Sequence, residues 1–390
     1  MKIAFESQLL MEEEKTGIGW VADGILRELM KQWPEAELQL NYFKLRNRSA
    51  GRPPGIQEYV NLGFQDVCAF FSFSLYKLIW NMVPIPYNRF FGKDTDITFF
   101  FNYYIPPGVK GKRVTIFHDM AYKVFPETVR ARTKMMLDSN MVQACKRADA
   151  ILTVSEFTKS EVVKYLDVNP EKITVMPLGI RRERFHTGYS EDQVIKVKEK
   201  YHLPNDYLLY LGTLEPRKNI SRLIEAYALL KQECADLPPL ILVGRKGWMY
   251  DEIFEKIQKL HLESDVWSTG YAENEDVPVL LKGAMAFVFP SIYEGFGMPP
   301  LEAMACGTPV LTSNVSSMPE VAGDCAVLVD PFSVESIRDG LRRMVQDQDL
   351  RKELTKKGIQ RAETFTWTRT AGIVSDVFRK LMQDKKNGKD

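Results

Sequence analysis

The chain has 390 residues, of which 45% are hydrophobic and 26% charged, and its 52 basic and 51 acidic side chains give a net charge of +1. This composition excludes disordered, collagen-like and coiled-coil proteins, and the near-zero net charge argues against a nucleic-acid-binding protein. Five cysteines without a closely spaced pair argue against a disulfide framework and a thiolate zinc site, which indicates a reducing compartment.

The predicted elements of the first half alternate between strand and helix. Residues 2–5 predict a buried strand, and hydrophobic side chains then recur at helical spacing from Ile18 to Leu29. Further strands are predicted at residues 97–101, 113–117, 150–154 and 172–176, with helices at 128–147 and 157–166. Such alternation predicts a mainly parallel sheet that is covered by helices.

A polar, highly charged segment at residues 181–206 predicts a hinge, after which a second alternating series begins. Its strands are predicted at residues 207–211, 239–243, 286–289 and 309–311, and its helices at 219–233, 249–260, 299–306, 333–346, 348–363 and 367–384. The fold class is therefore α/β, with two Rossmann-like doubly wound domains facing a cleft. The expected domains are residues 1–183 and 184–366, and the final helix within 367–390 is expected to cross back onto the first domain.

Two glutamates, Glu294 and Glu302, lie in the most informative segment, residues 290–309. The first follows an apolar strand, and the second lies about one turn into a helix whose start is marked by two prolines. Both carboxylates can reach one ligand, and a carboxylate that accepts paired hydroxyl groups suits a sugar or ribose ring. Gly295 and Gly297 allow close backbone approach, and amides at the helix start offer a cradle for an anion or a hydroxyl group.

This spacing resembles the Glu-x7-Glu signature of the retaining glycosyltransferases of the GT-B fold, family four (glycosyl transferases group 1). The resemblance covers residues 205–332 and is carried by Gly212, residues 215–219, 242–244, 270–271, 286–291, 319–321 and 330–331. It implies that Glu302 holds the ribose hydroxyls of a nucleotide donor and that Glu294 contacts the transferred sugar. It also implies donor binding by Gly244, Tyr271 and the backbone of Phe296, Gly297, Met298 and Pro299.

Two adjacent cations, Arg217 and Lys218, lie between a strand end and the start of a new helix. There the two side chains and the helix amino terminus can together bind a diphosphate. The predicted catalytic role of the two cations is to bind this diphosphate as a metal ion does in other enzymes. Many relatives carry an arginine earlier in this loop, where this chain has Gly212-Thr213, and Arg217 is expected to substitute for it. Asn219 is expected to cap the following helix.

The first domain holds two further candidates. The turn Thr16-Gly17-Ile18-Gly19 resembles the glycine turn with which family members bring backbone close to the donor phosphate. A nicotinamide dinucleotide fingerprint starting at Gly17 is the alternative, but that fingerprint requires a tighter turn after the strand. His118 emerges at the carboxyl end of an apolar strand, and the resemblance implies a catalytic role beside the transferred sugar. The alternative is a structural histidine whose hydrogen bonds are made inside the protein core.

Other charged and aromatic segments have weaker interpretations. Asp94-Thr95-Asp96 matches the metal-binding Asp-x-Asp of another glycosyltransferase fold, but it precedes a strand, so a polar turn explains it better. No metal and no cofactor are expected, and Arg181, Arg182 and Arg184 are assigned to a solvated linker.

Residues 64–92 contain nine aromatic residues, and residues 108–147 hold nine basic and three acidic ones. Two interpretations of these segments are equally favoured. In one, they contact an anionic membrane or a lipid diphosphate; in the other, the aromatic segment is a helix packed on the first core beside a solvated basic neighbour.

Together these features predict a retaining, metal-independent hexosyltransferase that moves a hexose from a nucleotide diphosphate donor to a glycan or lipid-linked acceptor in cell-surface polysaccharide synthesis. The Thr16 to Gly19 turn, His118 and the Glu215 to Asn219 loop look most like bacterial mannosyltransferases, which makes GDP-mannose the first donor. A UDP-sugar or deoxyhexose transferase, a GT-B sugar-nucleotide epimerase and a noncatalytic binding subunit are the alternatives. Because no secretory signal opens the sequence, a cytoplasmic location is expected, with peripheral contact at the inner face of the plasma membrane as an extension.

Overall fold

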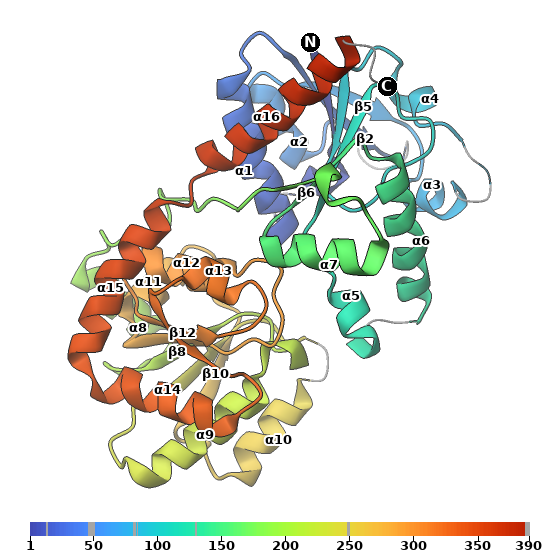
Figure 1. Ribbon diagram of the computed structural model, residues 1–390. Coiled ribbons are helices and arrows are strands. Elements are labelled where there is room, and N and C mark those ends of the chain that lie inside the picture. The colour runs from blue at the N-terminus through green and yellow to red at the C-terminus, as the bar shows by residue number, and fades with distance from the viewer. Residues whose placement is uncertain are drawn as a thin grey trace. The chain divides into compact units, whose positions relative to one another are not determined.

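A computed structural model describes residues 1–12, 15–45, 51–80, 83, 85–128, 131–247 and 250–386. Contacts divide the chain into two compact units, the first comprising residues 1–179 and 367–390 and the second residues 180–366. The first boundary therefore follows residue 179, where the sequence predicted residue 183. In each unit, helices cover both faces of a parallel sheet (Figure 1). The predicted α/β class with two Rossmann-like sheets is confirmed.

The first unit contains, among its described residues, a seven-stranded sheet with the order β3-β2-β1-β4-β5-β6-β7. Its strands are β1 Lys2–Glu6, β2 Glu37–Phe43, β3 Gln65–Ala69, β4 Ile97–Phe100, β5 Lys112–Phe117, β6 Ala150–Thr153 and β7 Ile173–Val175. β2 and β3 were not predicted, because polar residues interrupt their apolar pattern. Gln39 and Asn41 are nevertheless buried in β2, where the Gln39 amide donates to Asn41 Oδ1 at 2.6 Å.

The helices of the first unit include the carboxyl-terminal one. They are α1 Gly17–Gln32, α2 Pro54–Asn61, α3 Phe73–Ile79, α4 Asn88–Phe91, α5 Ala121–Val124, α6 Ala131–Arg147, α7 Glu156–Leu166 and α16 Trp367–Lys386, with 3-10 turns η1 Gln8–Leu10, η2 Pro126–Thr128 and η3 Pro170–Lys172. α16 packs along α1 (Figure 1). Gly24 permits this approach, because a Cβ there would lie 2.2 Å from the Trp367 indole. Trp33 Nε1 also donates to Ser375 Oγ at 2.8 Å, which ties α16 to the first unit.

The second unit contains, within its described part, a six-stranded parallel sheet with the order β10-β9-β8-β11-β12-β13. Its strands are β8 Leu208–Leu211, β9 Leu240–Val243, β10 Val266–Gly270, β11 Ala286–Phe289, β12 Val310–Ser313 and β13 Ala326–Val329. Its helices are α8 Glu191–Lys200, α9 Ile220–Glu233, α10 Asp251–Lys259, α11 Val277–Gly283, α12 Met298–Ala305, α13 Met318–Ala322, α14 Val334–Gln346 and α15 Gln348–Glu363, with the 3-10 turn η4 Pro216–Lys218.

Five elements of the second unit were missed, namely the helices α8, α11 and α13 and the strands β10 and β13. α8 lies inside the segment predicted as a hinge, and none of its residues is buried, so it lacks the hydrophobic stripe that identifies a helix in a sequence. A capping box stabilises its start instead, since Ser190 Oγ accepts from the Gln193 amide and the Gln193 side chain accepts from the Ser190 amide. β10 and β13 lie at the two edges of the sheet, where burial is incomplete and the apolar pattern is weaker.

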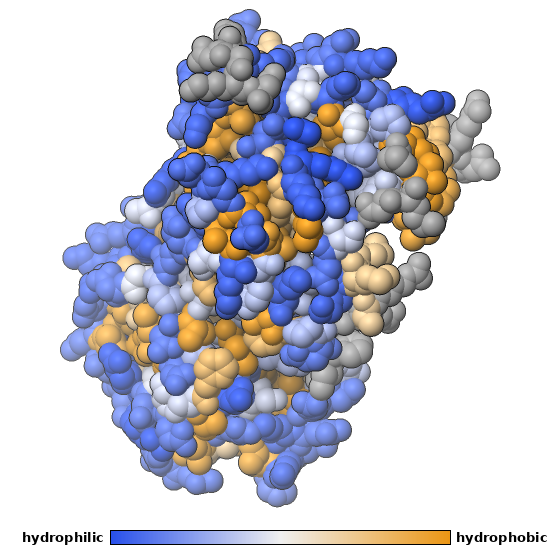
Figure 2. All heavy atoms as spheres, turned by 45° about the vertical axis from the view of Figure 1, so that its right-hand side comes forward, coloured by the Kyte–Doolittle hydropathy of each residue, from blue (hydrophilic) through white to orange (hydrophobic). Residues whose placement is uncertain are grey.

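The aromatic segment 64–92 contributes mainly to the core of the first unit. Phe70 is its one exposed ring, with 67% of its surface accessible, and the other eight are buried or packed against the core cluster. Leu75 and Leu78 are exposed beside it, and hydrophobic patches interrupt the hydrophilic surface of the first unit in Figure 2. The packed interpretation therefore accounts for most of the aromatic rings. No described helix is long and apolar enough to cross a membrane.

Candidate active site

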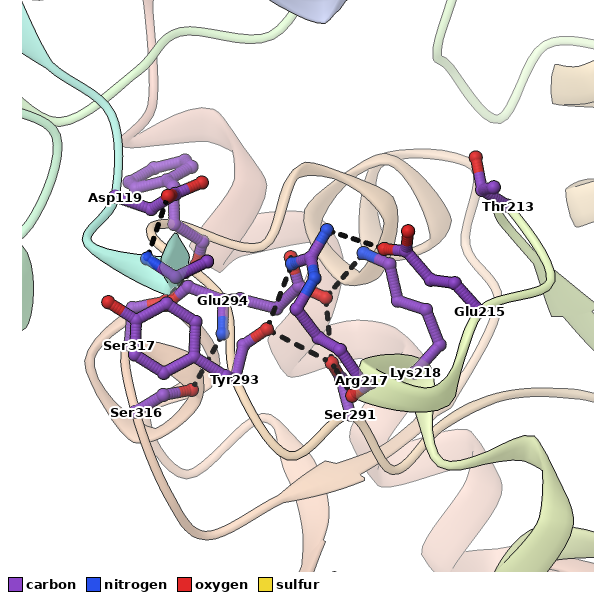
Figure 3. Close-up of polar contacts among 12 residues, drawn as sticks. Asp119, Thr213, Glu215, Arg217, Lys218, Ser291, Tyr293, Glu294, Ser316 and Ser317 are labelled. Atoms are coloured by element: carbon purple, nitrogen blue, oxygen red, sulfur yellow. Dashed lines mark hydrogen bonds and ion pairs between the residues drawn. The ribbon is translucent and has the colours of Figure 1, made fainter. Parts of the chain in front are cut away.

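A buried ion-pair cluster lies at the carboxyl end of β11, where the loop of residues 290–297 leaves the second sheet (Figure 3). Its centre is Glu294, whose carboxylate accepts from Lys218 Nζ at 2.5 Å, from Arg217 at 3.2 Å and from Ser291 Oγ at 2.7 Å. Burial raises the pKa of Glu294, but the two cations outweigh burial and hold that pKa below its usual value. Glu294 is therefore ionised at neutral pH.

The two cations reach Glu294 from η4, which follows β8. Arg217 also donates to Tyr293 O at 3.0 Å and to Glu215 at 2.6 Å, so its guanidinium is fixed by several oxygens. Lys218 is buried, and its ammonium lies 5.1 Å from the centre of the Phe289 ring. The structure thus brings Arg217, Lys218 and Glu294, which the sequence indicated one by one, into a single cluster.

Asn219 has a different role from the one predicted. It adopts a left-handed conformation, with φ +63°, and its side chain makes no capping hydrogen bond to α9. Its amide instead donates to Pro290 O at 3.0 Å and to Pro331 O at 2.7 Å. Asn219 therefore stands at the N-cap position of α9, as predicted, but its side chain does not cap the helix, because Oδ1 accepts from Arg222 at 3.0 Å instead. Asn219 holds the turn that carries Lys218 against the loop that carries Glu294.

The loop before α12 is held in place by Ser317. Its hydroxyl group bonds to the carbonyls of Glu294 at 2.9 Å and Phe296 at 2.8 Å, and Phe296 itself is buried. Gly297 has φ +107°, and a Cβ there would lie 2.2 Å from Met318 Cε, so only glycine fits.

The predicted amide cradle at the start of α12 is smaller than expected. Pro299 and Pro300 occupy the first turn and carry no N–H group. The amides of Gly297 and Met298 make no hydrogen bond with any described residue, so these two remain to bind a ligand.

Glu302 is the second of the two predicted glutamates, and it lies about one turn into α12. Burial raises its pKa to about 7, although Arg184 and Arg181 lower it in part. Two of the three arginines that the sequence assigned to a linker, Arg181 and Arg184, therefore act electrostatically on a predicted site residue. A carboxyl group with a pKa near 7 is about half ionised at neutral pH, ready to accept hydrogen bonds once it loses its proton.

The pH dependence of donor binding should report this group. In the role predicted for Glu302, ribose hydroxyls of a nucleotide donor donate to the ionised carboxylate, so donor affinity is expected to rise about tenfold between pH 6 and pH 8 as Glu302 deprotonates. Calorimetry at both pH values measures the change, and Glu302→Gln should bind with an affinity that no longer varies over this interval. An equally steep pH dependence in Glu302→Gln would assign the titration to another group.

Gly244 and Tyr271 lie at neighbouring strand ends of the same sheet edge. Gly244 follows β9, and a Cβ there would lie 1.9 Å from the carbonyl oxygen of Gly212, which follows β8. Tyr271 follows β10, is 49% exposed, and its ring centre lies 4.3 Å from the guanidinium carbon of Arg245. Gly244 is thus required by backbone packing, whereas Tyr271 presents a flat surface that a planar ligand can stack on.

In the first unit, Gly17 and Gly19 open α1. Thr16 caps this helix by accepting from the Gly19 amide at 3.3 Å, and a Cβ at Gly17 would meet no atom within 4 Å. β1 ends at Glu6, so the turn before Gly17 is much longer than a dinucleotide fingerprint requires. Open space beside Gly17 is compatible with close approach of a phosphate, and that role stays a prediction.

His118 follows β5, as predicted, and one of its two ring nitrogens has a hydrogen-bond partner within the first unit. Its Nε2 lies 2.8 Å from Phe101 O, which assigns the proton to Nε2 and leaves Nδ1 as an acceptor. Burial lowers the pKa of His118, although the Phe101 bond and Asp119 act against it. The ring is therefore neutral near pH 7, and any catalytic contribution is through hydrogen bonding rather than through a positive charge.

Comparison with known proteins supplies the family. Residues 192–361 match the family described as Glycosyl transferases group 1, and residues 28–184 match Glycosyltransferase Family 4. The O-antigen chain mannosyltransferase B of Escherichia coli is 37% identical over 267 residues, which cover 68% of this chain and 69% of that protein. The chain belongs to the group 1 glycosyl transferases.

Other relatives of this glycosyltransferase differ in length or share only its fold. The serotype-specific mannosyltransferase WbdA of Escherichia coli is 34% identical over 249 residues, and the match covers 63% of this chain but 30% of WbdA. Sucrose-phosphate synthase from Thermosynechococcus elongatus is 19% identical with a TM-score of 0.75, covering 98% of this chain and 99% of that one. The lipopolysaccharide glycosyltransferase WaaG is also 19% identical, with a TM-score of 0.70 and coverage of 96% and 99%. These structures show the GT-B fold.

The Asp-x-Asp sequence of this glycosyltransferase is part of a polar turn, as expected. Asp96 accepts from the Lys2 amide at 3.0 Å and pairs with Lys385 at 3.1 Å, both within the first unit. No group of three or more histidine, cysteine, aspartate or glutamate side chains suited to a metal ion occurs among the described residues.

Three side chains of the glycosyltransferase site were not predicted, namely Glu215, Ser291 and Ser317. Glu215 and Ser291 contact Arg217 and Glu294 directly, and Ser317 orders the loop between the two glutamates. Glu215 and Ser291 stand inside motifs that carried the resemblance, so their position was a usable signal. Ser317 precedes such a motif, and only its contacts in the fold reveal it.

Proposed function

We propose that this glycosyltransferase moves mannose from GDP-mannose to a glycan or lipid-linked acceptor, with retention at the anomeric carbon and without a metal ion, in cell-surface polysaccharide synthesis. The observation that carries the proposal is the cluster of Lys218, Arg217 and Glu294 at the carboxyl edge of the second sheet. Mannose and polysaccharide synthesis are supported by the names of the relatives, which include O-antigen and serotype-specific mannosyltransferases.

The cluster suits a departing diphosphate. When the bond between the anomeric carbon and the diphosphate oxygen breaks, negative charge grows on that oxygen, and preorganised donors nearby stabilise it. An ammonium has three N–H donors, and the bond to Glu294 uses one of those on Lys218. Lys218, Arg217 and the amides of Gly297 and Met298 are the groups proposed to bind this charge, which supports transfer without a metal.

The two glutamates have separate proposed tasks. Glu294 contacts hydroxyl groups of the transferred sugar and at the same time fixes both cations, while Glu302 accepts the ribose hydroxyls. Transfer is proposed to proceed by front-face displacement through an oxocarbenium-like transition state. The acceptor oxygen bonds to the anomeric carbon, its proton passes to the departing phosphate oxygen, and GDP leaves.

Thermal denaturation with nucleotide sugars tests donor class and metal independence together. A ligand that binds only the folded protein raises its melting temperature. GDP-mannose in the presence of EDTA is expected to raise it, with smaller shifts for UDP-glucose and TDP-glucose at the same concentration. A larger shift with a UDP- or TDP-sugar would contradict GDP-mannose as the donor and identify that sugar nucleotide instead. Loss of the shift with EDTA would overturn metal independence.

Tyr271 is proposed to stack on the nucleobase of the donor. Tyr271→Ala is expected to raise the dissociation constant of GDP-mannose about tenfold, because it removes the stacking surface, while kcat changes little. Calorimetry and initial rates measure the two quantities, and Tyr271→Phe, which keeps the ring, should bind as the wild type does. Equal affinity of Tyr271→Ala and wild type would place the base elsewhere.

A further inference from the structure

Several basic residues of segment 108–147 have partners in the helices of the first unit or in its loops, and three others lie close together. Lys123 and Lys134 both pair with Asp138, and the Arg147 guanidinium donates to Ile105 O at 2.7 Å. Lys110, Lys112 and Arg113, by contrast, lie together in the turn that enters β5 and in its first residues. Three basic residues of this segment are therefore close together at one place in the first unit.

These three residues line a pocket of about 430 Å³. The pocket lies at the amino ends of β4, β5 and β6, and the end of α16 contributes to it. Five of its eight lining residues are basic and one is acidic: Lys93, Thr95, Lys110, Gly111, Lys112, Arg113, Asp149 and Lys385. Because His118 and the turn before Gly17 follow the carboxyl ends of strands, this pocket is on the opposite edge of the first sheet.

The walls of the pocket are fixed by close packing and by ion pairs. Gly111 has φ +74°, and a Cβ there would lie 2.2 Å from the carbonyl oxygen of Thr95, so the two turns can meet only at a glycine. Arg113 binds both carboxylate oxygens of Asp149, at 2.8 and 3.2 Å, and Lys385 pairs with Asp96 at 3.1 Å. The basic groups are thus held around a preformed cavity.

Two cations of the pocket, Lys93 and Lys110, differ from Arg113 and Lys385 in their surroundings. Lys93 and Lys110 are exposed, and neither makes an ion pair with any residue that the structure describes. Asp149 and Asp96 pair with Arg113 and Lys385, so Lys93 and Lys110 add their positive charge to the lining of this cavity. A concave surface with excess positive charge attracts anions, and lysine ammonium groups bind phosphate oxygens as point charges.

We propose that this pocket binds a phosphate or diphosphate group and forms an anion site separate from the transfer site. The phosphate belongs either to the headgroup of an anionic phospholipid or to a free phosphorylated molecule, since both offer the same oxygens. Such a site gives the enzyme an attachment or regulatory contact on the edge of the first sheet that the transfer chemistry does not use.

Titration of the full chain with pyrophosphate, followed by amide NMR, tests the proposal at the site itself. The amide resonances of Gly111 and Thr95 are expected to shift on titration. In the variant Lys93→Glu with Lys110→Glu the apparent dissociation constant should rise at least tenfold. The matched control is Lys196→Glu with Lys259→Glu, which makes the same charge change at two exposed lysines of the second unit and should bind as the wild type does.

Flotation with vesicles then distinguishes the two sources of phosphate. If the phosphate is a lipid headgroup, vesicles of phosphatidylglycerol carry the wild type and the control but not the pocket variant, and phosphatidylcholine vesicles carry none. If pyrophosphate shifts Gly111 and Thr95 but no vesicle retains the protein, the ligand is a soluble phosphorylated molecule. Unchanged Gly111 and Thr95 resonances, or equal affinity in the pocket variant with its spectrum otherwise native, would overturn the proposal.

Discussion

Lys218→Met is expected to lower kcat/KM for sugar transfer about 1,000-fold. The ammonium is proposed to stabilise the departing diphosphate, and removal of one preorganised donor of this kind has effects of about this size. The same change leaves Glu294 buried with one cation fewer, which should destabilise the second unit by about 3 kcal/mol. Initial rates with GDP-mannose and urea denaturation measure the two effects.

Two further variants separate catalysis from folding. Lys218→Arg keeps the charge beside Glu294, so it should recover most of the stability while its different geometry recovers less activity. Lys231→Met removes a lysine that pairs with Asp265 at 2.6 Å on the surface of the same unit, and it should change stability by less than about 1 kcal/mol and activity not at all. Near-normal transfer by Lys218→Met in its folded form would remove Lys218 from the mechanism.

Gly244→Ala is expected to destabilise the second unit by about 4 kcal/mol. The added Cβ would lie 1.9 Å from Gly212 O, so the ends of β8 and β9 must separate, and φ +154° adds strain for an alanine. Urea denaturation of the full chain measures the loss. Gly17→Ala is the matched control for stability, because its Cβ meets no atom within 4 Å, and its stability should change by less than about 1 kcal/mol.

The comparison of these two glycines also separates packing from ligand contact. A Gly244→Ala protein of wild-type stability would show that the strand ends can part freely and that the glycine is required for another reason. Gly17→Ala should keep its stability, and a loss of donor affinity in that variant would support the predicted approach of phosphate to its backbone.

The elements that the sequence predicted are those with continuous apolar runs or a clear hydrophobic stripe. β8, β9 and β11 are buried along their whole central part and were found within one or two residues. β2 and α8 escaped because their stability has other sources, namely a buried amide pair in β2 and a capping box in an exposed helix. Such features depend on contacts that a periodicity pattern does not contain.

The candidate site was predictable in its residue types but not in its connections. Glu294, Lys218 and Arg217 stood out because they lie between apolar strands and helix starts and because they match motifs of the family that the sequence resembles. That Asn219 bonds to Pro290 and Pro331, rather than capping α9, follows from the meeting of three loops that are distant in the sequence. The raised pKa of Glu302 likewise depends on burial, which the fold alone determines.

The most direct test of the proposed activity is an NMR analysis of the product formed from GDP-mannose and a mannoside acceptor in the presence of EDTA. Transfer of mannose with an α configuration at the new linkage, matching that of the donor, and release of GDP only when acceptor is present are the expected results. A β-linked product, an absolute requirement for an added divalent cation, or conversion of the sugar nucleotide without acceptor would contradict retaining, metal-independent mannosyl transfer.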